Sequence, residues 1–361
     1  MDRVRLIAEL ARQRAYCECR SPLYAAVLRE LEADAAAGSP PWLERIEAAW
    51  RDRTFAVGWE AAHLLLAAMH YWALKGDAAE LAEIYPSCGG PGGAPRGAAK
   101  GFLRRAPSGF WEKLRLGLVQ TNEIDRSIAW MLAAGAAFRT PGMAFHLVEL
   151  GTSAGLNLVG DHLPHECRFA SETGGSAPAP ADWNGAPHRI LTRAGLDLRP
   201  RRLEDPADRL WLKACVWADD LARLERLERA TQVFLQLARE PSGPRLERCA
   251  FSEAPDWLAA NRPPRHGEGL LVFNSIATIY LGDAEYADLQ RAMARVLAPW
   301  GSRGLWVEYE RARGAREGPL ELCVHRALHG RLDTRLLGSG APRPQEIRLR
   351  GGWEALSAGS S

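Results

Sequence analysis

The order of hydrophobic and polar positions changes near residue 138. Before that point apolar side chains recur every three or four residues, as at Val4, Ile7 and Leu10, and the strict alternation typical of strands is absent. After that point short apolar runs alternate with helical segments. We therefore predict a helical N-terminal domain over residues 1–138 and an α/β domain over residues 139–361.

Five short apolar runs in the second part predict strands: AFHLVEL (144–150), HRILTRAGLDL (188–198), PRLERC (244–249), GLLVFNSI (269–276) and RGLWVEYE (303–310). Helical patterns lie between them, over residues 208–217, 221–239 and 283–297. Strands that alternate with helices form a parallel sheet with helices on both faces. The expected architecture is a Rossmann-like, doubly wound sheet, with loops at the Gly- and Pro-rich segments 88–97 and 171–187.

Composition and charge argue against nucleic acids and anionic membranes as binding partners. The 361 residues include 46 Lys and Arg against 44 Asp and Glu, so there is no overall field to attract nucleic acid or an anionic membrane. The longest uncharged stretches, 61–74 and 269–282, are shorter than the roughly 20 residues of a membrane span. The seven Cys are scattered without a C-x-x-C pair, and the charged N-terminus does not resemble a signal peptide. We expect a soluble, reduced, cytoplasmic protein.

A glycine-containing turn at residues 149–157 follows the first predicted strand and opens a helix. This is the position at which a doubly wound sheet binds a nucleotide. Gly151 allows a tight turn, Gly155 allows close packing, and free main-chain amides at the helix start would face the ligand. Ser153 replaces the second glycine of the dinucleotide motif, so a dinucleotide pyrophosphate is not expected.

The same turn also spells G-x-S-x-G, the nucleophile elbow of α/β-hydrolases. A hydrolase would need an acid and then a His after Ser153, and His266, His325 and His329 are available. Such an elbow normally follows several strands, whereas about 140 residues of helix precede this turn. A serine hydrolase is therefore an alternative that we rank lower.

Polar side chains also end the later strands, and successive strand ends meet at the carboxyl edge of a parallel sheet. Asp197 follows the second strand and is suited to accepting two ribose hydroxyls, while Glu253 follows the third and is suited to an adenine amine. Asn274 and Ser275 end the fourth strand. Each alone fits a loop or a helix cap, but polar groups at consecutive strand ends predict a bound nucleoside.

Taken together, these motifs resemble those of class I S-adenosylmethionine-dependent methyltransferases. They look still more like a bacterial family catalogued only as a domain of unknown function, whose fold is assigned as methyltransferase-like. The segments that carry this likeness are YCECRSPLYAAVLREL (16–31), QTNEIDRS (120–127), ELGTSAGLNL (149–158), GLDLRP (195–200), DRLWLKACVW (208–217) and VFNSIATIYL (272–281). The resemblance spans most of the chain, with Ser252-Glu253 standing where that family has Gly-Asp.

The resemblance implies that S-adenosylmethionine is bound at the turn and the strand ends. The implied cofactor-binding residues there are Glu149, Gly151, Thr152, Ser153, Gly155, Asn157, Asp197, Glu253, Asn274 and Ser275. Ser153 stands for the middle glycine of the usual turn, which would shift the methionine end of the ligand. The Asn-Pro-Pro-aromatic motif of amino-methylating enzymes is absent from the fourth strand.

A polar segment, residues 120–126, precedes the helix that leads into the first strand. We expect Gln120 to bind the methionine end of the cofactor, and Asn122 and Glu123 to take part in catalysis. Tyr280 would place an aromatic face beside the sulfonium. The alternative is that Thr121 or Asn122 only caps the helix.

Two reactions fit this reading, with the helical domain covering the carboxyl edge. We favour methyl transfer to a small molecule. The alternative is attack by the cofactor's own amine, which yields azetidine-2-carboxylate and methylthioadenosine; azetidine-2-carboxylate synthases have a layout that this chain resembles. A nucleoside-binding module without catalysis is a third possibility. No metal is expected, because His325 and His329 have only Glu321 in line with them.

Overall fold

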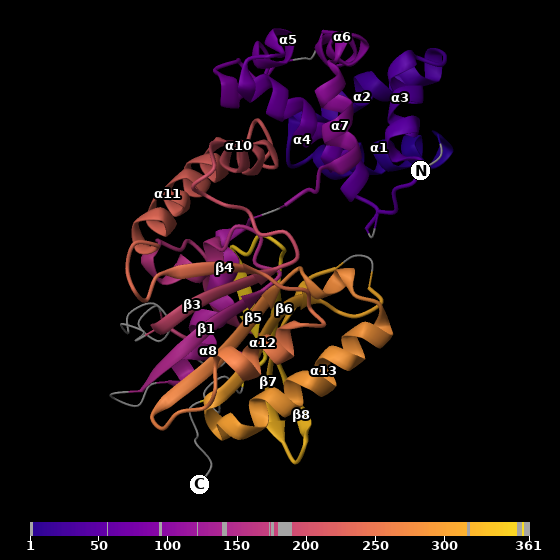
Figure 1. Ribbon diagram of the computed structural model, residues 1–361. Coiled ribbons are helices and arrows are strands. Elements are labelled where there is room, and N and C mark those ends of the chain that lie inside the picture. Colours follow the sequence, from indigo (N-terminus) through magenta and orange to yellow (C-terminus); the bar gives the residue numbers. More distant parts are fainter. Residues whose placement is uncertain are drawn as a thin grey trace. The chain divides into compact units, whose positions relative to one another are not determined.

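The computed structural model describes residues 3–55, 57–93, 96–120, 122–138, 143–172, 174, 177–179, 190–315, 318–351 and 356. The chain divides into two compact units. The helical unit comprises Met1–Thr121 and Leu203–Glu228, and the sheet unit comprises Asn122–Arg202 and Arg229–Ser361. Figure 1 shows the helices of the first unit and the twisted sheet of the second.

The helical unit is built around a core rich in Trp, Leu and Ala. Its helices are α1 (Arg3–Cys17), α2 (Pro22–Ala37), α3 (Pro41–Trp50), α4 (Glu60–Lys75), α5 (Ala79–Ala82), η1 (Pro86–Cys88), α6 (Ala98–Arg105), α7 (Ser108–Leu116) and α10 (Pro206–Ala214). Helix α11 (Leu221–Leu237) begins in this unit and ends in the other. Helix α4 is buried along almost all its length, which explains why apolar residues occupy most of its positions.

The sheet unit contains one sheet of nine strands. They are β1 (Ala144–Leu150), β2 (Arg168–Ser171), β3 (Ile190–Asp197), β4 (Pro244–Arg248), β5 (Glu268–Ser275), β6 (Gly304–Arg311), β7 (Leu320–Leu328), β8 (Arg331–Gly340) and β9 (Glu346–Leu349). Five neighbouring strands, in the order β4-β3-β1-β5-β6, are all parallel. Numbered along the chain, these five have the order 3-2-1-4-5 that defines a Rossmann-like sheet.

Helices cover both faces of the parallel strands (Figure 1). Helix α8 (Ile128–Ala137) packs on the face that includes Leu147, and helices α12 (Ala254–Asn261) and α13 (Asp283–Leu297) pack on the face that includes Val148. Strands buried on both faces read as continuous apolar runs, which is why AFHLVEL and GLLVFNSI were recognisable. The remaining short helices are η2 (Ile124–Ser127), η3 (Leu156–His162), η4 (Thr278–Tyr280) and η5 (Ala298–Arg303).

The structure differs from the sequence prediction in where the units divide. We predicted one division at residue 138, but α8 packs on the sheet and belongs to the sheet unit. Residues 203–228, predicted as part of the α/β domain, belong instead to the helical unit, because Trp211 and Trp217 are buried in its core.

Two stretches of secondary structure also differ. The prediction stopped at residue 310, but β7, β8 and β9 follow as an antiparallel meander beside β6. The predicted loop 171–187 begins at the last residue of β2, and most of its remainder lies outside the described residues.

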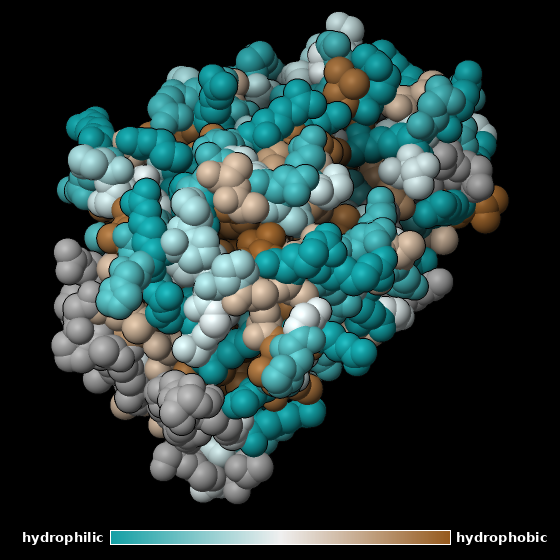
Figure 2. All heavy atoms as spheres, turned by 60° about the horizontal axis from the view of Figure 1, so that its bottom comes forward, coloured by the Kyte–Doolittle hydropathy of each residue, from teal (hydrophilic) through white to brown (hydrophobic). Residues whose placement is uncertain are grey.

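No helix in the described ranges combines the length and the apolar character needed to span a bilayer. On the face shown in Figure 2, hydrophobic side chains lie in small groups among hydrophilic ones.

Candidate functional site

The parallel strands change direction of crossover between β1 and β5, so this is the topological switch point of the sheet. Ligands of doubly wound folds bind outside the carboxyl ends of the strands at such a point. Glu149 lies next to the end of β1, and Ser275 is the last residue of β5. The ends of β1, β3, β4, β5 and β6 and the loops that follow them are called the carboxyl edge below.

The turn after β1 is tight and closely packed. Gly151 and Gly155 have φ angles of +68° and +73°, which favour glycine. A Cβ on Gly151 would come within 2.5 Å of Ala277, and one on Gly155 within 2.7 Å of Leu246. The turn therefore lies directly against the segments that follow β5 and form β4.

The main-chain amides of this turn are used inside the protein, which corrects one expectation. Gly151 N and Thr152 N both donate to Leu196 O, and Ser153 N donates to the Asp197 carboxylate at 2.8 Å. The segment that follows is the short 3-10 helix η3, interrupted at Val159, and not the expected helix from about residue 154. These amides do not form an open cradle for a phosphate group.

Glu149 is 2% exposed and is held by the turn itself. Thr152 Oγ1 donates to its Oε2 at 2.6 Å, and Asn157 Nδ2 donates to its Oε1 at 2.9 Å. Burial raises the pKa of the Glu149 carboxyl to about 7, although both hydrogen bonds and the charge of Arg126 act in the opposite direction. Glu149 can therefore exchange a proton near neutral pH.

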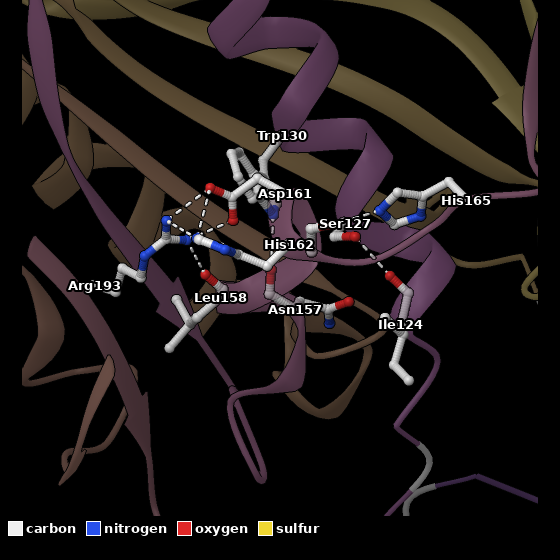
Figure 3. A network of polar contacts seen from close by, with 10 residues as sticks. Ile124, Ser127, Trp130, Asn157, Leu158, Asp161, His162, His165 and Arg193 are labelled. Carbon is white, nitrogen blue, oxygen red and sulfur yellow. Dashed lines mark hydrogen bonds and ion pairs between the residues drawn. The ribbon is translucent and has the colours of Figure 1, made fainter. Parts of the chain in front are cut away.

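Side chains from α8 and β3 fix the main chain of η3 (Figure 3). Trp130 Nε1 donates to Asn157 O at 2.9 Å, and the Arg193 guanidinium binds both the Asp161 carboxylate, at 2.7 Å, and Leu158 O. These contacts hold the backbone of Asn157 while its side chain reaches Glu149.

Asp197 lies at the end of β3 and is half-buried. Its two oxygens accept from Ser153 N and from Arg199 N, at 2.8 and 2.7 Å. Each carboxylate oxygen can accept a further hydrogen bond, so the orientation suits a hydroxyl-bearing ligand. Glu253 precedes α12 after β4, but it is exposed and accepts only from Ala250 N among described groups.

Two carboxyl groups on β6 were missed by the sequence analysis. Glu310 Oε1 accepts from Asn274 Nδ2, Ala277 N and Thr278 N at 2.7–3.0 Å. Glu308 accepts from Tyr286 Oη at 2.6 Å and lies 2.9 Å from His325 Nε2. Burial and the nearby Glu308 raise the pKa of the Glu310 carboxyl to about 7.

The contacts of Asn274 do not fit its expected role as a cofactor ligand. It is fully buried, its amide nitrogen donates to the two β6 carboxyl groups, and its oxygen accepts from Trp306 Nε1. The next residues, Ser275 and Ile276, are half-buried. Ile276 has a φ of +46°, a strained conformation for a β-branched residue, and such strain often occurs at functional sites.

Among the residues that the structure describes, the capping alternative is not supported for Asn122, whose side chain caps neither η2 nor α8. Neither η2 nor α8 has a capping hydrogen bond from the side chain at its first position. Glu123 is buried and its Oε2 pairs with Arg343 Nε at 3.2 Å, while Arg126 Nε donates to Pro342 O. Gln120 belongs to the helical unit, and Thr121 lies outside the described residues.

Four buried polar atoms near the carboxyl edge lack a hydrogen-bond partner in the described part of the chain. They are Asn122 Nδ2, Ser153 Oγ, Asn157 Oδ1 and Glu310 Oε2. Buried polar atoms are nearly always paired in folded proteins, and unpaired ones call for an explanation. They come from three separate segments, and two of them belong to residues that also contact Glu149 or Asp197.

Buried charged side chains of both signs lie in this region. Arg193 is paired with Asp161, and Arg343 with Glu123, so Arg126 is the cation whose charge acts on both Glu149 and Glu310. All three groups are at most 7% exposed. A ligand that carries positive charge would balance this arrangement.

The geometry gives the hydrolase alternative no support. Ser153 has the positive φ of +55° that an elbow serine can adopt, but none of the described His residues is hydrogen-bonded to it. His325 contacts Glu308 and Thr334, and His329 follows β7 at the opposite edge of the sheet. His325 lies on strand β7, and His329 follows the end of that strand.

Tyr280 is 46% exposed in η4, and its phenol lies close enough to Arg126 for their charges to interact. In the part of the chain that is described, no three His, Cys, Asp or Glu residues gather as metal ligands would.

Comparison with known families gives one result. A bacterial family described as "Uncharacterized protein conserved in bacteria (DUF2332)" matches residues 8–349. No curated protein matches the chain.

Proposed function

The chain thus belongs to the DUF2332 family of bacteria, and we propose that it is an S-adenosylmethionine-dependent enzyme of the methyltransferase-like class. The reaction is nucleophilic attack on a carbon attached to the sulfonium. Methyl transfer to a small-molecule acceptor is the reaction that we favour. The ligand would lie at the carboxyl edge of the sheet unit, near Glu149, Asp197 and Glu310.

The observation that carries the proposal is the excess of buried negative charge at the switch point. Glu149 and Glu310 are both buried there, and the buried Arg126 is a cation whose charge acts on both of them. S-adenosylmethionine has a permanent sulfonium charge and an ammonium group, so it would compensate these carboxylates. A dinucleotide would add two phosphate charges of the wrong sign to this region, whose turn amides are already used.

The polar atoms without partners support the same ligand. Asn122 Nδ2 can donate to the methionine carboxylate, and Asn157 Oδ1 and Glu310 Oε2 can accept from the ammonium group or from the acceptor substrate. Asp197 is suited to the ribose hydroxyls, since both its oxygens are already oriented by main-chain N–H groups. The ligand would pair with groups that have no partner in the described part of the chain.

Glu310 is our candidate for the proton acceptor. Three donors fix its Oε1, while its Oε2 has no partner among the described residues. In methyl transfer the nucleophile forms a bond to the methyl carbon, and the sulfur keeps the electron pair of the broken bond. The proton of the nucleophile passes to Glu310, whose pKa of about 7 matches a base at neutral pH.

Intramolecular cyclisation remains the alternative, because it needs the same charge arrangement. The α-amine would lose its proton to a carboxylate and attack the γ-carbon, and methylthioadenosine would leave with the electron pair. Reacting atoms must approach to about 3–3.5 Å in line with the breaking bond. The two reactions differ in whether a second substrate is required.

Incubation of the purified protein with S-adenosylmethionine alone, followed by mass spectrometry, tests these possibilities. Conversion to S-adenosylhomocysteine only after a cell extract is added would support methyl transfer. Methylthioadenosine with an equimolar amino acid, well above the uncatalysed background, would support cyclisation or lysis.

Absence of both products, together with absence of binding in calorimetry, would overturn the proposal. Binding without turnover would leave a nucleoside-binding module. Glu310→Gln is expected to lower turnover while binding is retained, and Asp288→Asn on the exposed part of α13 is the matched control.

A further inference from the structure

Two of the sequence segments that carry the family resemblance meet in the helical unit, and the proposed reaction does not use them. Ser21 Oγ, at the start of α2, donates to the Asp219 carboxylate, whose two oxygens lie 2.7 and 2.8 Å away. Leu23 N lies 3.4 Å from the same carboxylate. Asp219 thereby ties the segment after α10 to the first turn of α2.

Three aromatic side chains gather beside this carboxylate. The ring centroids of Tyr24 and Tyr85 are 6.0 Å apart, and those of Tyr24 and Trp217 are 6.4 Å apart, both in edge-to-face arrangements. Tyr24 and Tyr85 are at most 1% exposed, and Trp217 is 6% exposed. The charge of Asp219 raises the pKa of both tyrosine hydroxyls, although burial is the larger cause. We call Tyr24, Tyr85, Trp217 and Asp219 the aromatic–acidic cluster.

The phenol hydroxyls and the indole N–H group of these three side chains have no hydrogen-bond partner in the described residues. They are Tyr24 Oη, Tyr85 Oη and Trp217 Nε1. The Tyr24 hydroxyl also lies near the Ala218 main chain, whose hydrogen bonding favours its ionised form, so it is the least isolated of the three. Tyr85 Oη and Trp217 Nε1 therefore carry the argument. A buried indole N–H or phenol normally finds a partner, and burial of either without one is costly.

The capping role of Asp219 does not account for these groups. Asp219 is half-exposed and makes no ion pair within the described ranges, whereas Glu30 nearby already binds Gly97 N and Lys100 N. His70 is not a cation here, because burial lowers its pKa to about 4. The cluster thus offers, within the described residues, a carboxylate that forms no ion pair next to buried aromatic rings.

We infer that the aromatic–acidic cluster is a second binding site, which takes a small organic ammonium compound that also bears a hydroxyl or carbonyl oxygen. The ammonium group binds the Asp219 carboxylate and the faces of the aromatic rings, because a carboxylate and π-faces both attract a cation. The oxygen of the ligand accepts from Trp217 Nε1 and from the Tyr85 hydroxyl. One ligand therefore satisfies the charge and both donors.

Ethanolamine is the probe for this site, because it carries an ammonium and a hydroxyl group on two carbons. The full chain, labelled with ¹⁵N in its Trp indoles, is titrated in the millimolar range expected of a ligand with so few atoms. The Trp217 signal is identified by its loss in Trp217→Phe. Ethanolamine is expected to shift this signal, and ethylene glycol, which has the same size without the charge, is not.

Two variants test which groups bind the probe. Asp219→Asn is expected to weaken ethanolamine binding by roughly tenfold or more, because a charge-assisted contact is lost. Tyr85→Phe removes only the unpaired hydroxyl, so it should weaken binding while the melting temperature stays equal or rises. Tyr71→Phe, in the same unit and outside the cluster, is the matched control.

A Trp217 signal that ethanolamine leaves unchanged would overturn the inference. An equal shift of this signal with ethylene glycol would also overturn it, and so would an unchanged affinity for ethanolamine in Tyr85→Phe. The Tyr85→Phe measurement tests the inference even if Asp219→Asn fails to fold. S-adenosylmethionine binding is measured on the same samples, so failure of this site is distinguished from failure of the proposed function.

Discussion

Glu149 and Glu310 are carboxyl groups at positions where a negative charge is costly. Burial raises the pKa of each from the ordinary 4.5 to about 7. Between about pH 4.5 and about pH 7, Glu149 and Glu310 keep protons in the folded chain that they have already released in the unfolded chain. Their contribution to the free energy of unfolding therefore falls as the pH rises through this window. A bound cation would favour the ionised carboxylates and offset that loss.

The affinity for S-adenosylmethionine is therefore expected to rise with pH. Between about pH 5.5 and about pH 7.5 the association constant should increase roughly tenfold for each carboxylate that contacts the cation. Calorimetry at several pH values measures this, with S-adenosylhomocysteine, which lacks the sulfonium charge, as the control ligand. Equal pH dependence for the two ligands, or none for either, would contradict the charge argument.

Asp197 is the residue on which recognition of the ribose should depend. Asp197→Ala is expected to weaken S-adenosylmethionine binding by about 1–3 kcal/mol, because hydrogen bonds to a charged acceptor are lost. Isothermal titration calorimetry gives the value, and Asp288→Ala on α13 is the control. A dissociation constant unchanged in Asp197→Ala would remove this residue from the site.

Sequence reasoning identified several of these residues, but not their contacts. Glu149, Asp197 and Ser275 stand at strand ends, and strand ends are readable because each apolar run stops there. Glu308 and Glu310 were missed although the signal was present. Two acidic residues two positions apart in a central strand must share one buried face. The positive φ of Ile276 could not be predicted from the sequence, because β-branched residues rarely adopt this conformation.

At the scale of elements, the turn from β1 to η3 combines strain with a Ser153 hydroxyl that has no hydrogen-bond partner among the described residues. Ser153→Gly should raise the free energy of unfolding by about 1 kcal/mol or more, because glycine adopts a positive φ without strain and leaves no buried hydroxyl. Ser153→Ala removes the hydroxyl alone and should stabilise less.

Chemical denaturation gives the free energy of unfolding of each Ser153 variant. The difference between Ser153→Gly and Ser153→Ala reports the backbone strain, because both variants lack the hydroxyl. If the hydroxyl contacts the ligand, both variants should bind S-adenosylmethionine more weakly than the unmodified chain. Stability lower than that of the unmodified chain in both variants would show that the Ser153 hydroxyl is paired in the folded protein.

The elements were predictable to different degrees for a physical reason. Strands β1 and β5 are buried on both faces and give continuous apolar runs. Strand β7 has buried Leu320, Leu322 and Val324 at alternate positions, so its period of two was readable, whereas β8 has exposed, charged residues along its first half. An α-helix was expected after residue 154, but the structure has the short 3-10 helix η3 there. In this conformation the Asn157 side chain donates to Glu149, and Leu158 O accepts from Arg193.

At the scale of the molecule, the two proposed ligands should act on different units. Hydrogen exchange followed by mass spectrometry should show protection at 149–157, 197–201 and 274–281 when S-adenosylmethionine is added. Ethanolamine should protect the start of α2 and the segment after α10 instead. Bound ligand stabilises only the state that binds it, so protection limited to the helical unit with S-adenosylmethionine would contradict the proposed site.

The helical unit is discontinuous in the chain, and this has a consequence for how the protein is made. Its core includes Trp211 and Trp217, which follow β3 in the sequence. During synthesis the first 121 residues leave the ribosome well before Trp211 and Trp217 are translated. Until then α10 cannot pack on α4, and the apolar side of α4 that α10 covers stays exposed. Over that interval the nascent chain exposes an apolar surface of the kind that chaperones bind, and it is covered only after β1, β2 and β3 have also been translated.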